Sequence, residues 1–145
     1  MIGLIQRVAH ASVQVDGNTC ATIKTGLLAL IGVQTDDTER RADRLLERLL
    51  GYRVFADEQG RMNFSLADIS GGLLLVPEFT LAANTRKGMR ASFTGAASGE
   101  KGKVLFDYLA RTASESYAVV ATGIFGAHMK VHLENDGPVT FWLES

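Results

Sequence analysis

The segment Leu74–Phe93, LLVPEFTLAANTRKGMRASF, decides how the rest of the chain is interpreted. Its apolar start is typical of a buried strand, which Pro77-Glu78-Phe79-Thr80 interrupts. The irregular loop that follows carries basic side chains at Arg86, Lys87 and Arg90. Small folds often bind anionic substrates where a buried strand ends in a cationic loop. An ordinary strand and surface loop would give the same pattern, so the residues alone leave both interpretations open.

Length and composition are those of an ordinary globular protein. Of the 145 residues, 46% are hydrophobic and 21% are charged, enough for one domain over residues 1–145 with its own core. Cys20 is the only cysteine, and no charged leader precedes an apolar stretch, so we expect a cytoplasmic location and a small buried thiol. The longest apolar runs, at 26–33 and 71–77, are too short to span a bilayer, so we expect no membrane association.

The formal net charge of −1 excludes a uniformly basic surface but not a local basic patch. Such a patch could combine the basic loop with two lysines further along, although a solvated loop would look the same. The residues concerned are Arg86, Lys87, Arg90, Lys101 and Lys103.

Hydrophobic periodicity predicts an α+β fold, with two packed, mostly antiparallel β-sheets and two main helices on one side. Alternation predicts an antiparallel meander at the start, and the run 27–34 predicts a strand covered on both faces. The meander strands are 2–8, 11–15 and 19–24; the helices are 38–51 and about 103–117; 65–70 is a connection; and the later strands are 52–55, 62–64, 73–76, 118–122, 127–134 and 139–143.

No metal or cofactor site is expected from the motifs. His128 and His132 are two pleats apart on a predicted strand, with only Glu134 and Asp136 as further ligands nearby, which favours surface histidines. The chain contains no G-x-S-x-G elbow, no G-x-x-x-x-G-K-[ST] and no G-x-G-x-x-G.

Asn135-Asp136-Gly137-Pro138 is a strong turn signal between the last two predicted strands. Its Gly-Pro bond could be cis, which would fix two successive carbonyl groups in one direction. Those carbonyls could bind the amine of a ligand without any side chain. A plain hairpin turn is the alternative, and the residues alone slightly favour it.

Five separated blocks together resemble the D-aminoacyl-tRNA deacylase (DTD) family in order and spacing, over essentially the whole chain. The blocks are IQRVAHASVQV (5–15), LLALIGV (27–33), RLLERLLGYRVF (44–55), FTLAANTRKGMRASF (79–93) and NDGPVTFWL (135–143). The resemblance implies a DTD-like fold and a homodimeric hydrolase that acts on aminoacylated tRNA. It would cleave the ester between a D-amino acid, or glycine mischarged on alanine tRNA, and the terminal adenosine, as quality control of translation.

Two signatures make the site in that family. The second is intact here as Asn135, Gly137, Pro138 and Thr140. The resemblance implies that the Gly137-Pro138 bond is cis and enters the partner subunit's pocket, where its carbonyls exclude L-amino acids and hold the substrate's amino group.

The first signature, Ser-Gln-x-Thr, departs from the family because Pro77-Glu78 replaces Ser-Gln, although Phe79 and Thr80 follow the pattern. Pro77 removes a hydroxyl and a backbone donor. An ionised Glu78 would oppose an oxyanion or help to bind the substrate's ammonium group, whereas a protonated one could donate a hydrogen bond. The sequence does not choose among these.

By the same resemblance, backbone amides near Phe79 and Thr80 would polarise the ester. Thr80 has the position of a nucleophile, but no base is visible in sequence, so we favour assistance from the ribose 2′-hydroxyl of the tRNA. Arg7 and Met129 would support the pocket, and Arg86, Lys87 and Arg90 would contact tRNA phosphates.

Two alternatives stay open. Pro77 is also similar to a sister family of relaxed chirality that removes L-alanine from threonine tRNA. Pro77-Glu78 could also mean a non-catalytic, tRNA-binding dimer.

Overall fold

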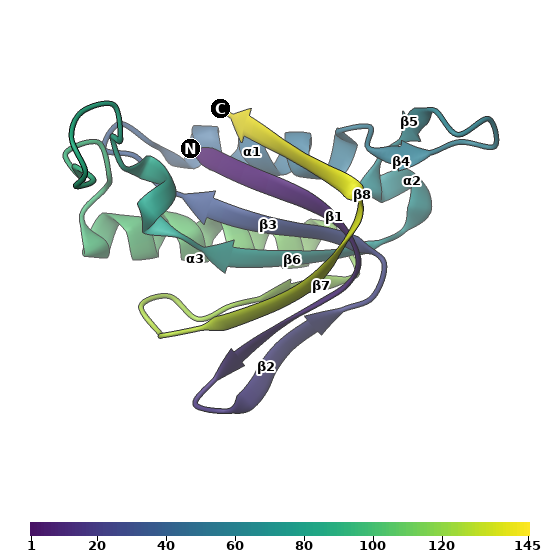
Figure 1. The fold of residues 1–145 in the computed structure, drawn as a ribbon, viewed down its shortest axis with the longest axis horizontal. Helices are drawn as coiled ribbons and strands as arrows, with labels where there is room; N and C mark the ends of the chain where they lie inside the picture. The colour runs from purple at the N-terminus through teal and green to yellow at the C-terminus, as the bar shows by residue number, and fades with distance from the viewer.

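A six-stranded mixed sheet forms the centre of the fold, in a computed structural model that covers residues 1–145 (Figure 1). The strands run in the order β2-β1-β3-β6-β7, and β8 pairs with the free edge of β1. Their bounds are β1 Ile2–Val15, β2 Asn18–Ile23, β3 Gly26–Gly32, β6 Gly72–Pro77, β7 Val120–Thr122 and β8 Lys130–Glu144. A separate hairpin is made by β4 Phe55–Ala56 and β5 Met62–Phe64.

Strand β1 organises the sheet because three strands pair with it. Residues Ile2–Val8 pair antiparallel with β3, Ala11–Val15 pair with β2, and β8 follows nearly the whole opposite edge. The predicted strands 2–8 and 11–15 are therefore one strand. The predicted pairing of 11–15 with 19–24 is confirmed by the antiparallel β1–β2 pair. The three-stranded meander is wrong, because its first two strands are continuous.

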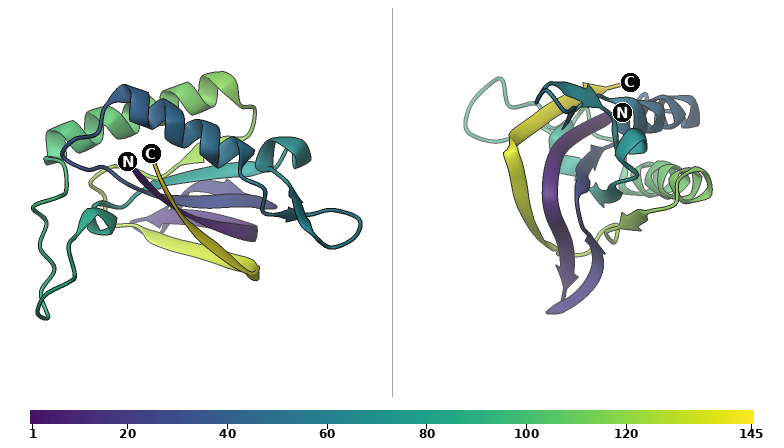
Figure 2. Two further views of the ribbon diagram at one scale, coloured as in Figure 1. Left: turned by 90° about the horizontal axis from the view of Figure 1, so that it is seen from above. Right: turned by 90° about the vertical axis from the view of Figure 1, so that its right-hand side faces the viewer.

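The α+β class is confirmed, but two packed sheets are not found. One sheet curves strongly instead (Figure 2), and side chains from β1, β2, β3 and β6 pack inside the curve. Those residues are Val8, Ala11, Val13, Ala21, Ile23, Leu28, Leu74 and Val76. Local alternation and apolar runs predict these strand segments, but the bend in β1 that joins the two halves has no counterpart in either pattern.

Both main helices cover the same face of the sheet, as predicted (Figure 2). Helix α1 spans Glu39–Gly51 and α3 spans Gly99–Ser116. They share the main core cluster through Ala42, Leu45, Leu46 and Leu49 of α1 and Leu105, Phe106, Leu109 and Ala113 of α3. None of the helices is both long enough and apolar enough to cross a membrane.

Capping residues move two helix boundaries away from the predictions. Helix α3 begins at Gly99 rather than near 103, because Ser98 accepts a hydrogen bond from the Lys101 amide at 3.3 Å. The predicted connection 65–70 contains a short helix, α2 (Leu66–Ile69), which Ser65 and Asp68 start with a reciprocal capping box. The prediction for Cys20 is wrong: its side chain was expected to be buried, but it is exposed.

The end of the chain does not form the predicted hairpin. Residues on both sides of Asn135-Asp136-Gly137-Pro138 belong to β8 and pair with β1 in the same direction. The register shifts between Gln6 and Val8 and again between Val8 and His10, so the four residues form an irregular joint within one strand. We call residues 135–138 the joint.

Candidate active site

The end of strand β6 positions the first group of predicted site residues. Pro77 is the last residue of β6, and the Glu78 amide donates to the Ile31 carbonyl of β3 at 2.8 Å. Strand β7 pairs only with Leu73–Leu75 of β6. No ladder hydrogen bond on that side therefore requires a backbone N–H at Pro77, which proline lacks. A 3-10 helix, η1 (Phe79–Ala82), follows directly. The proline thus ends the strand where the chain turns into the site.

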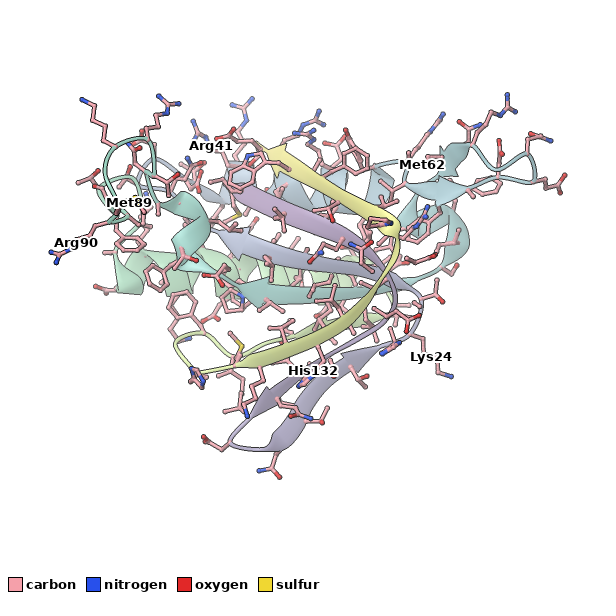
Figure 3. The ribbon with its side chains drawn as sticks, viewed as in Figure 1. Lys24, Arg41, Met62, Met89, Arg90 and His132 are labelled. Carbon is pink, nitrogen blue, oxygen red and sulfur yellow. The ribbon has the colours of Figure 1, made fainter.

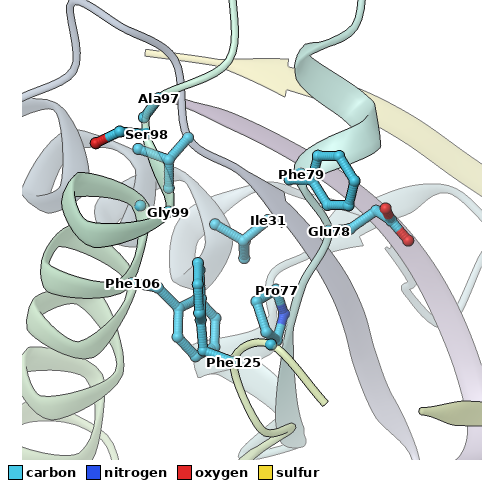
Figure 4. Close-up of a pocket in the computed structure, with 12 residues that line it drawn as sticks. Ile31, Pro77, Glu78, Phe79, Ala97, Ser98, Gly99, Phe106 and Phe125 are labelled. Atoms are coloured by element: carbon cyan, nitrogen blue, oxygen red, sulfur yellow. The ribbon is translucent and has the colours of Figure 1, made fainter. Parts of the chain in front are cut away.

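Glu78 caps this turn with its own carboxylate. Its Oε1 atom accepts hydrogen bonds from the Thr80 amide, at 3.2 Å, and from the Thr80 hydroxyl. Its Oε2 atom accepts no hydrogen bond from the chain, and no lysine or arginine forms an ion pair with it. Figure 4 shows the carboxylate directed away from the Phe106 and Phe125 rings. We call Glu78-Phe79-Thr80 the cap turn.

A mostly apolar cavity of about 200 Å³ opens beside the cap turn (Figure 4). It lies between the ends of β3 and β6, the start of α3 and the loop after β7. The Phe106 and Phe125 rings lie 6.3 Å apart at its base, and a Cβ atom on Gly102 would come within 3.3 Å of the Phe125 ring. We call this cavity the slot; its principal lining residues are Ile31, Pro77, Gly102, Phe106 and Phe125.

An apolar slot of this kind suits a flat aromatic group, which aromatic side chains hold by stacking and by excluding water. The Phe79 side chain stands beside it with 61% of its surface exposed, and its ring lies 5.1 Å from that of Phe93.

The predicted basic loop leaves from the end of η1. Asn84 and Ser92 close it with two backbone hydrogen bonds of 2.7 and 3.0 Å. Its side chains Arg86, Lys87 and Arg90 are exposed and form no ion pair within the chain. Arg90 projects from one end of the molecule, far from Lys24 at the turn after β2 (Figure 3). The loop that follows η1 therefore carries three free cations.

The joint is held by its own asparagine. Asn135 accepts a hydrogen bond from the Val139 amide at 2.7 Å and donates to the Val139 carbonyl at 3.2 Å and to the Thr140 hydroxyl at 3.0 Å. The Gly137-Pro138 peptide bond is cis, and both residues are exposed. The intact second signature thus forms one compact, exposed feature.

Arg7 ties this joint to the rest of the fold. Its Nε donates to the Asp136 carbonyl at 2.8 Å, and its Nη1 donates to the Val54 carbonyl, before β4, at 2.7 Å. The arginine side chain is 15% exposed. A Cβ atom on Gly137, whose φ is +148°, would meet Val139 at 2.7 Å and Arg7 at 3.2 Å.

Met129 belongs to the other end of the molecule. Its sulfur accepts a hydrogen bond from the Ile124 amide at 3.3 Å, and a Cβ atom on Gly123 would meet this sulfur at 2.8 Å and Pro77 at 3.4 Å. The structure therefore brings Met129 to the β6 end, with the cap turn, and Arg7 to the joint.

Within one chain, the cap turn and the joint stay apart. Thr140 pairs opposite Gln6, Gln6 opposite Leu28, and Leu28 opposite Leu74. Three strand spacings, about 14 Å, therefore separate β8 from β6, and the offset along the strands from Pro138 to Glu78 adds about 15–20 Å. Figure 1 shows the bend in β8 and the start of η1 at opposite ends of the sheet.

Sequence reasoning missed two features of this site. It found no base near Thr80, whereas the Glu78 carboxylate accepts a hydrogen bond from the Thr80 hydroxyl. The Glu-x-Thr spacing before a short turn could have indicated this contact. It also missed the slot, because Phe106 and Phe125 are far from Pro77 in the sequence and only the fold brings them beside it.

The family model described as D-Tyr-tRNA(Tyr) deacylase matches residues 4–144. The chain belongs to this deacylase family. A protein of Thioalkalivibrio sulfidiphilus named D-aminoacyl-tRNA deacylase is 66% identical over 144 residues, which cover 99% of this chain and 97% of that protein. A protein of the same name from Stutzerimonas stutzeri is 59% identical, with both chains covered completely.

Two solved structures are similar to this deacylase-family chain. One, titled c-Myc DNA Unwinding Element Binding Protein, is 34% identical, with a TM-score of 0.95 over 100% of this chain and 99% of that chain. The other, titled as a probable eukaryotic D-amino acid tRNA deacylase, has a TM-score of 0.85 over 99% of this chain and 98% of that chain. Its identity is 17%, so that likeness shows a shared fold.

Proposed function

We propose that residues 1–145 form a D-aminoacyl-tRNA deacylase domain. It hydrolyses the ester bond of D-aminoacyl-tRNA, and of glycyl-tRNA mischarged on alanine tRNA, releases the amino acid and tRNA, and rejects L-amino acids. The observation that carries this proposal is the 66% identity, over nearly the whole length of both chains, to a protein named D-aminoacyl-tRNA deacylase. A cytoplasmic location stays a prediction.

The slot and the cap turn support a binding mode for the substrate. The terminal adenine would enter the apolar slot against Phe106 and Phe125. The ester would then lie at the opening of the slot beside the cap turn, which we call the mouth. Because the Thr80 amide already donates to Glu78, we assign polarisation of the ester carbonyl to the Phe79 amide. Thr80 shapes the mouth, and the ribose 2′-hydroxyl assists the attack of water.

A homodimer would complete the site. The joint lies too far from the cap turn of its own chain to touch the same small substrate, and yet Arg7 and Asn135 hold it rigidly in an exposed position. In the proposed dimer, Gly137-Pro138 of one copy enters the mouth of the other and meets the amino group and α-carbon of the substrate. Exclusion of L-amino acids is then steric and depends on two chains.

The basic loop is assigned to the acceptor end of tRNA. Arg86, Lys87 and Arg90 carry unpaired charges next to the mouth, where the phosphates that precede the terminal adenosine would pass. This arrangement supports RNA recognition by a protein whose net charge is close to zero.

Hydrolysis of three esters by the wild-type protein tests this function. We expect rapid release of tyrosine from D-Tyr-tRNA, and little from L-Tyr-tRNA or from L-alanine on threonine tRNA. Cleavage of the L-alanyl ester would support the relaxed-chirality alternative, and survival of all three esters would support a non-catalytic, tRNA-binding dimer. The names of the relatives favour the first outcome.

Mixing two inactive variants tests the shared site separately. Thr80→Arg fills the mouth, and Gly137→Val disrupts the joint. Subunit exchange at equal amounts should make half of the dimers mixed, each with one intact site, and restore about a quarter of wild-type activity. No recovery, with subunit exchange demonstrated, would contradict a site built from two chains.

A further inference from the structure

We propose that Glu78 is a specificity-determining residue that recognises the charged α-ammonium group of the substrate, so that esters with a neutral group in its place are discriminated against. The inference rests on the proposed function. It gives a role to Glu78, which stands where the family's first signature has glutamine.

The Glu78 carboxylate has an oxygen available to a ligand. Oε1 is used by the Thr80 amide and hydroxyl, but Oε2 accepts no hydrogen bond within the chain. Neither Arg86, Lys87 nor Arg90 forms an ion pair with Glu78, although all three follow it in the same segment. Glu78 is therefore a half-buried carboxylate with one oxygen free, held in a fixed orientation by the turn that it caps.

Glu78 also lies beside the slot that would hold the adenosine. Pro77, Glu78 and Phe79 all line the slot, and the Glu78 carboxylate points away from the Phe106 and Phe125 rings at its base (Figure 4). An adenosine in the slot leaves its ester at the mouth, and the amino acid extends beyond it. The α-ammonium group is attached to the carbon next to the ester carbonyl, so a substrate that reaches the Phe79 amide also brings its ammonium group near Glu78.

The negative charge of Glu78 requires a positive partner during the reaction. Hydrolysis of the ester develops negative charge on oxygen, and an uncompensated carboxylate nearby opposes that charge. An ammonium group paired with Glu78 neutralises the carboxylate and forms a charge-assisted hydrogen bond. A substrate with a hydroxyl group in place of the ammonium group would provide neither effect. Glu78 thus makes both binding and reaction depend on the positive charge of the substrate.

The contact between Glu78 and Thr80 also allows a different role, in which the carboxylate is a general base for the Thr80 hydroxyl. The two roles differ in one observable. A base accelerates esters with and without an ammonium group alike, whereas an ammonium site changes the ratio between them.

The experiment compares two non-hydrolysable probes, 3′-amide-linked D-tyrosyl adenosine and its nearly isosteric analogue with a hydroxyl group in place of the α-amino group. Their dissociation constants are measured by calorimetry for the wild type, Glu78→Gln and Glu58→Gln. Glutamine keeps an oxygen that can cap Thr80, so Glu78→Gln removes charge while retaining the cap; Glu58 is an exposed residue in the β4–β5 loop.

We expect the wild type and Glu58→Gln to prefer the amine probe by about tenfold or more, and Glu78→Gln to lose most of that preference. Equal preference in the wild type and Glu78→Gln would overturn the proposal. So would a fall in D-Tyr-tRNA cleavage by Glu78→Gln that leaves the probe ratio unchanged, because that result identifies a base. Failure of the proposed function is distinguished by the wild type alone, as absence of D-Tyr-tRNA hydrolysis.

Discussion

Arg7 Nε donates a hydrogen bond to the carbonyl oxygen of Asp136 at 2.8 Å, and this bond joins the bend of β1 to the joint in β8. The same guanidinium donates to the Val54 carbonyl at 2.7 Å, so one side chain holds the joint and the segment before β4 together. Arg7 is thereby a positioning residue for Gly137-Pro138.

We predict that Arg7→Ala lowers deacylation by about tenfold or more and lowers the free energy of unfolding by about 1–3 kcal/mol, because two carbonyls lose a charged donor. Arg7→Lys should retain the charge but not both bonds, and should recover only part of the activity. Single-turnover kinetics and urea denaturation measure the two effects. Arg53→Ala, a change of an exposed neighbour of Val54, is the matched control. A wild-type rate of deacylation in Arg7→Ala would show that Arg7 does not position the joint.

The backbone at Gly137 gives a second prediction. Gly137→Ala should destabilise the fold by about 1–3 kcal/mol, because φ is +148° and the new Cβ would lie 2.7 Å from a Val139 methyl group and 2.9 Å from the Val139 amide. Gly51→Ala, at the end of α1 with no atom within 4 Å, should be nearly neutral. Thermal unfolding compares them, and equal stability of the two variants would show that the joint tolerates a side chain.

The loop cations should act on tRNA binding rather than on the chemical step. Arg86→Ala, Lys87→Ala and Arg90→Ala should each raise KM, leave the saturated single-turnover rate nearly unchanged, and reduce the dependence of log K on log salt by about 0.7–0.9 per phosphate contact. Lys24→Ala, at the far side of the molecule (Figure 3), should change neither. If the loop variants and Lys24→Ala have the same salt slope, the loop does not contact phosphates.

Gly102 sets how closely Phe125 approaches α3. Gly102→Ala would place a Cβ atom 3.3 Å from the Phe125 ring, push the ring into the slot and weaken adenosine binding. Phe125→Ala should weaken the same binding by about 1–3 kcal/mol through loss of stacking. Val104→Ala, an exposed residue on the same helix, is the control. Calorimetric titration with adenosine tests this, and unchanged affinity in Phe125→Ala would exclude the slot as the base site.

Asp68 gives a prediction about pH. Hydrogen bonds from the Ser65 amide and then from its hydroxyl lower the pKa of Asp68 below its ordinary value. A lowered folded-state pKa contributes stability that is present above the unfolded-state pKa and is lost as pH falls through the folded one. Asp68→Asn should therefore be less stable than wild type at pH 7 and indistinguishable from it in strong acid. A deficit in Asp68→Asn that stays constant from pH 7 down to strong acid would contradict the linkage.

The sequence predicts those features of this fold that depend on local periodicity. The apolar spacing of Leu45, Leu46 and Leu49 places α1 correctly, and the apolar run before Pro77 places β6. The bend of β1 and the continuity of β8 depend on pairing between distant strands, which no local pattern records. Turn composition at the joint therefore predicted a hairpin where the structure has a single strand.

Some features of the candidate site could likewise be predicted from the sequence, and others depend on the three-dimensional fold. Asn135 and Thr140 are grouped by the resemblance to the family's second signature, and the structure places them in contact. Phe106 and Phe125 could not be grouped from the sequence, because helix α3 and the loop after β7 meet at Pro77 only in three dimensions. The Glu78–Thr80 contact depends on the rotamer of a capping side chain, which spacing permits but does not specify.

The ratio of single-turnover rate constants for D-Tyr-tRNA and L-Tyr-tRNA, measured with the wild-type protein at saturating concentration, tests the central claim most directly. A deacylase that excludes L-amino acids sterically should cleave the D-ester at least about a hundredfold faster, which corresponds to about 3 kcal/mol in the barrier. Equal rates for the two esters, or no cleavage of the D-ester above the rate in buffer, would contradict it.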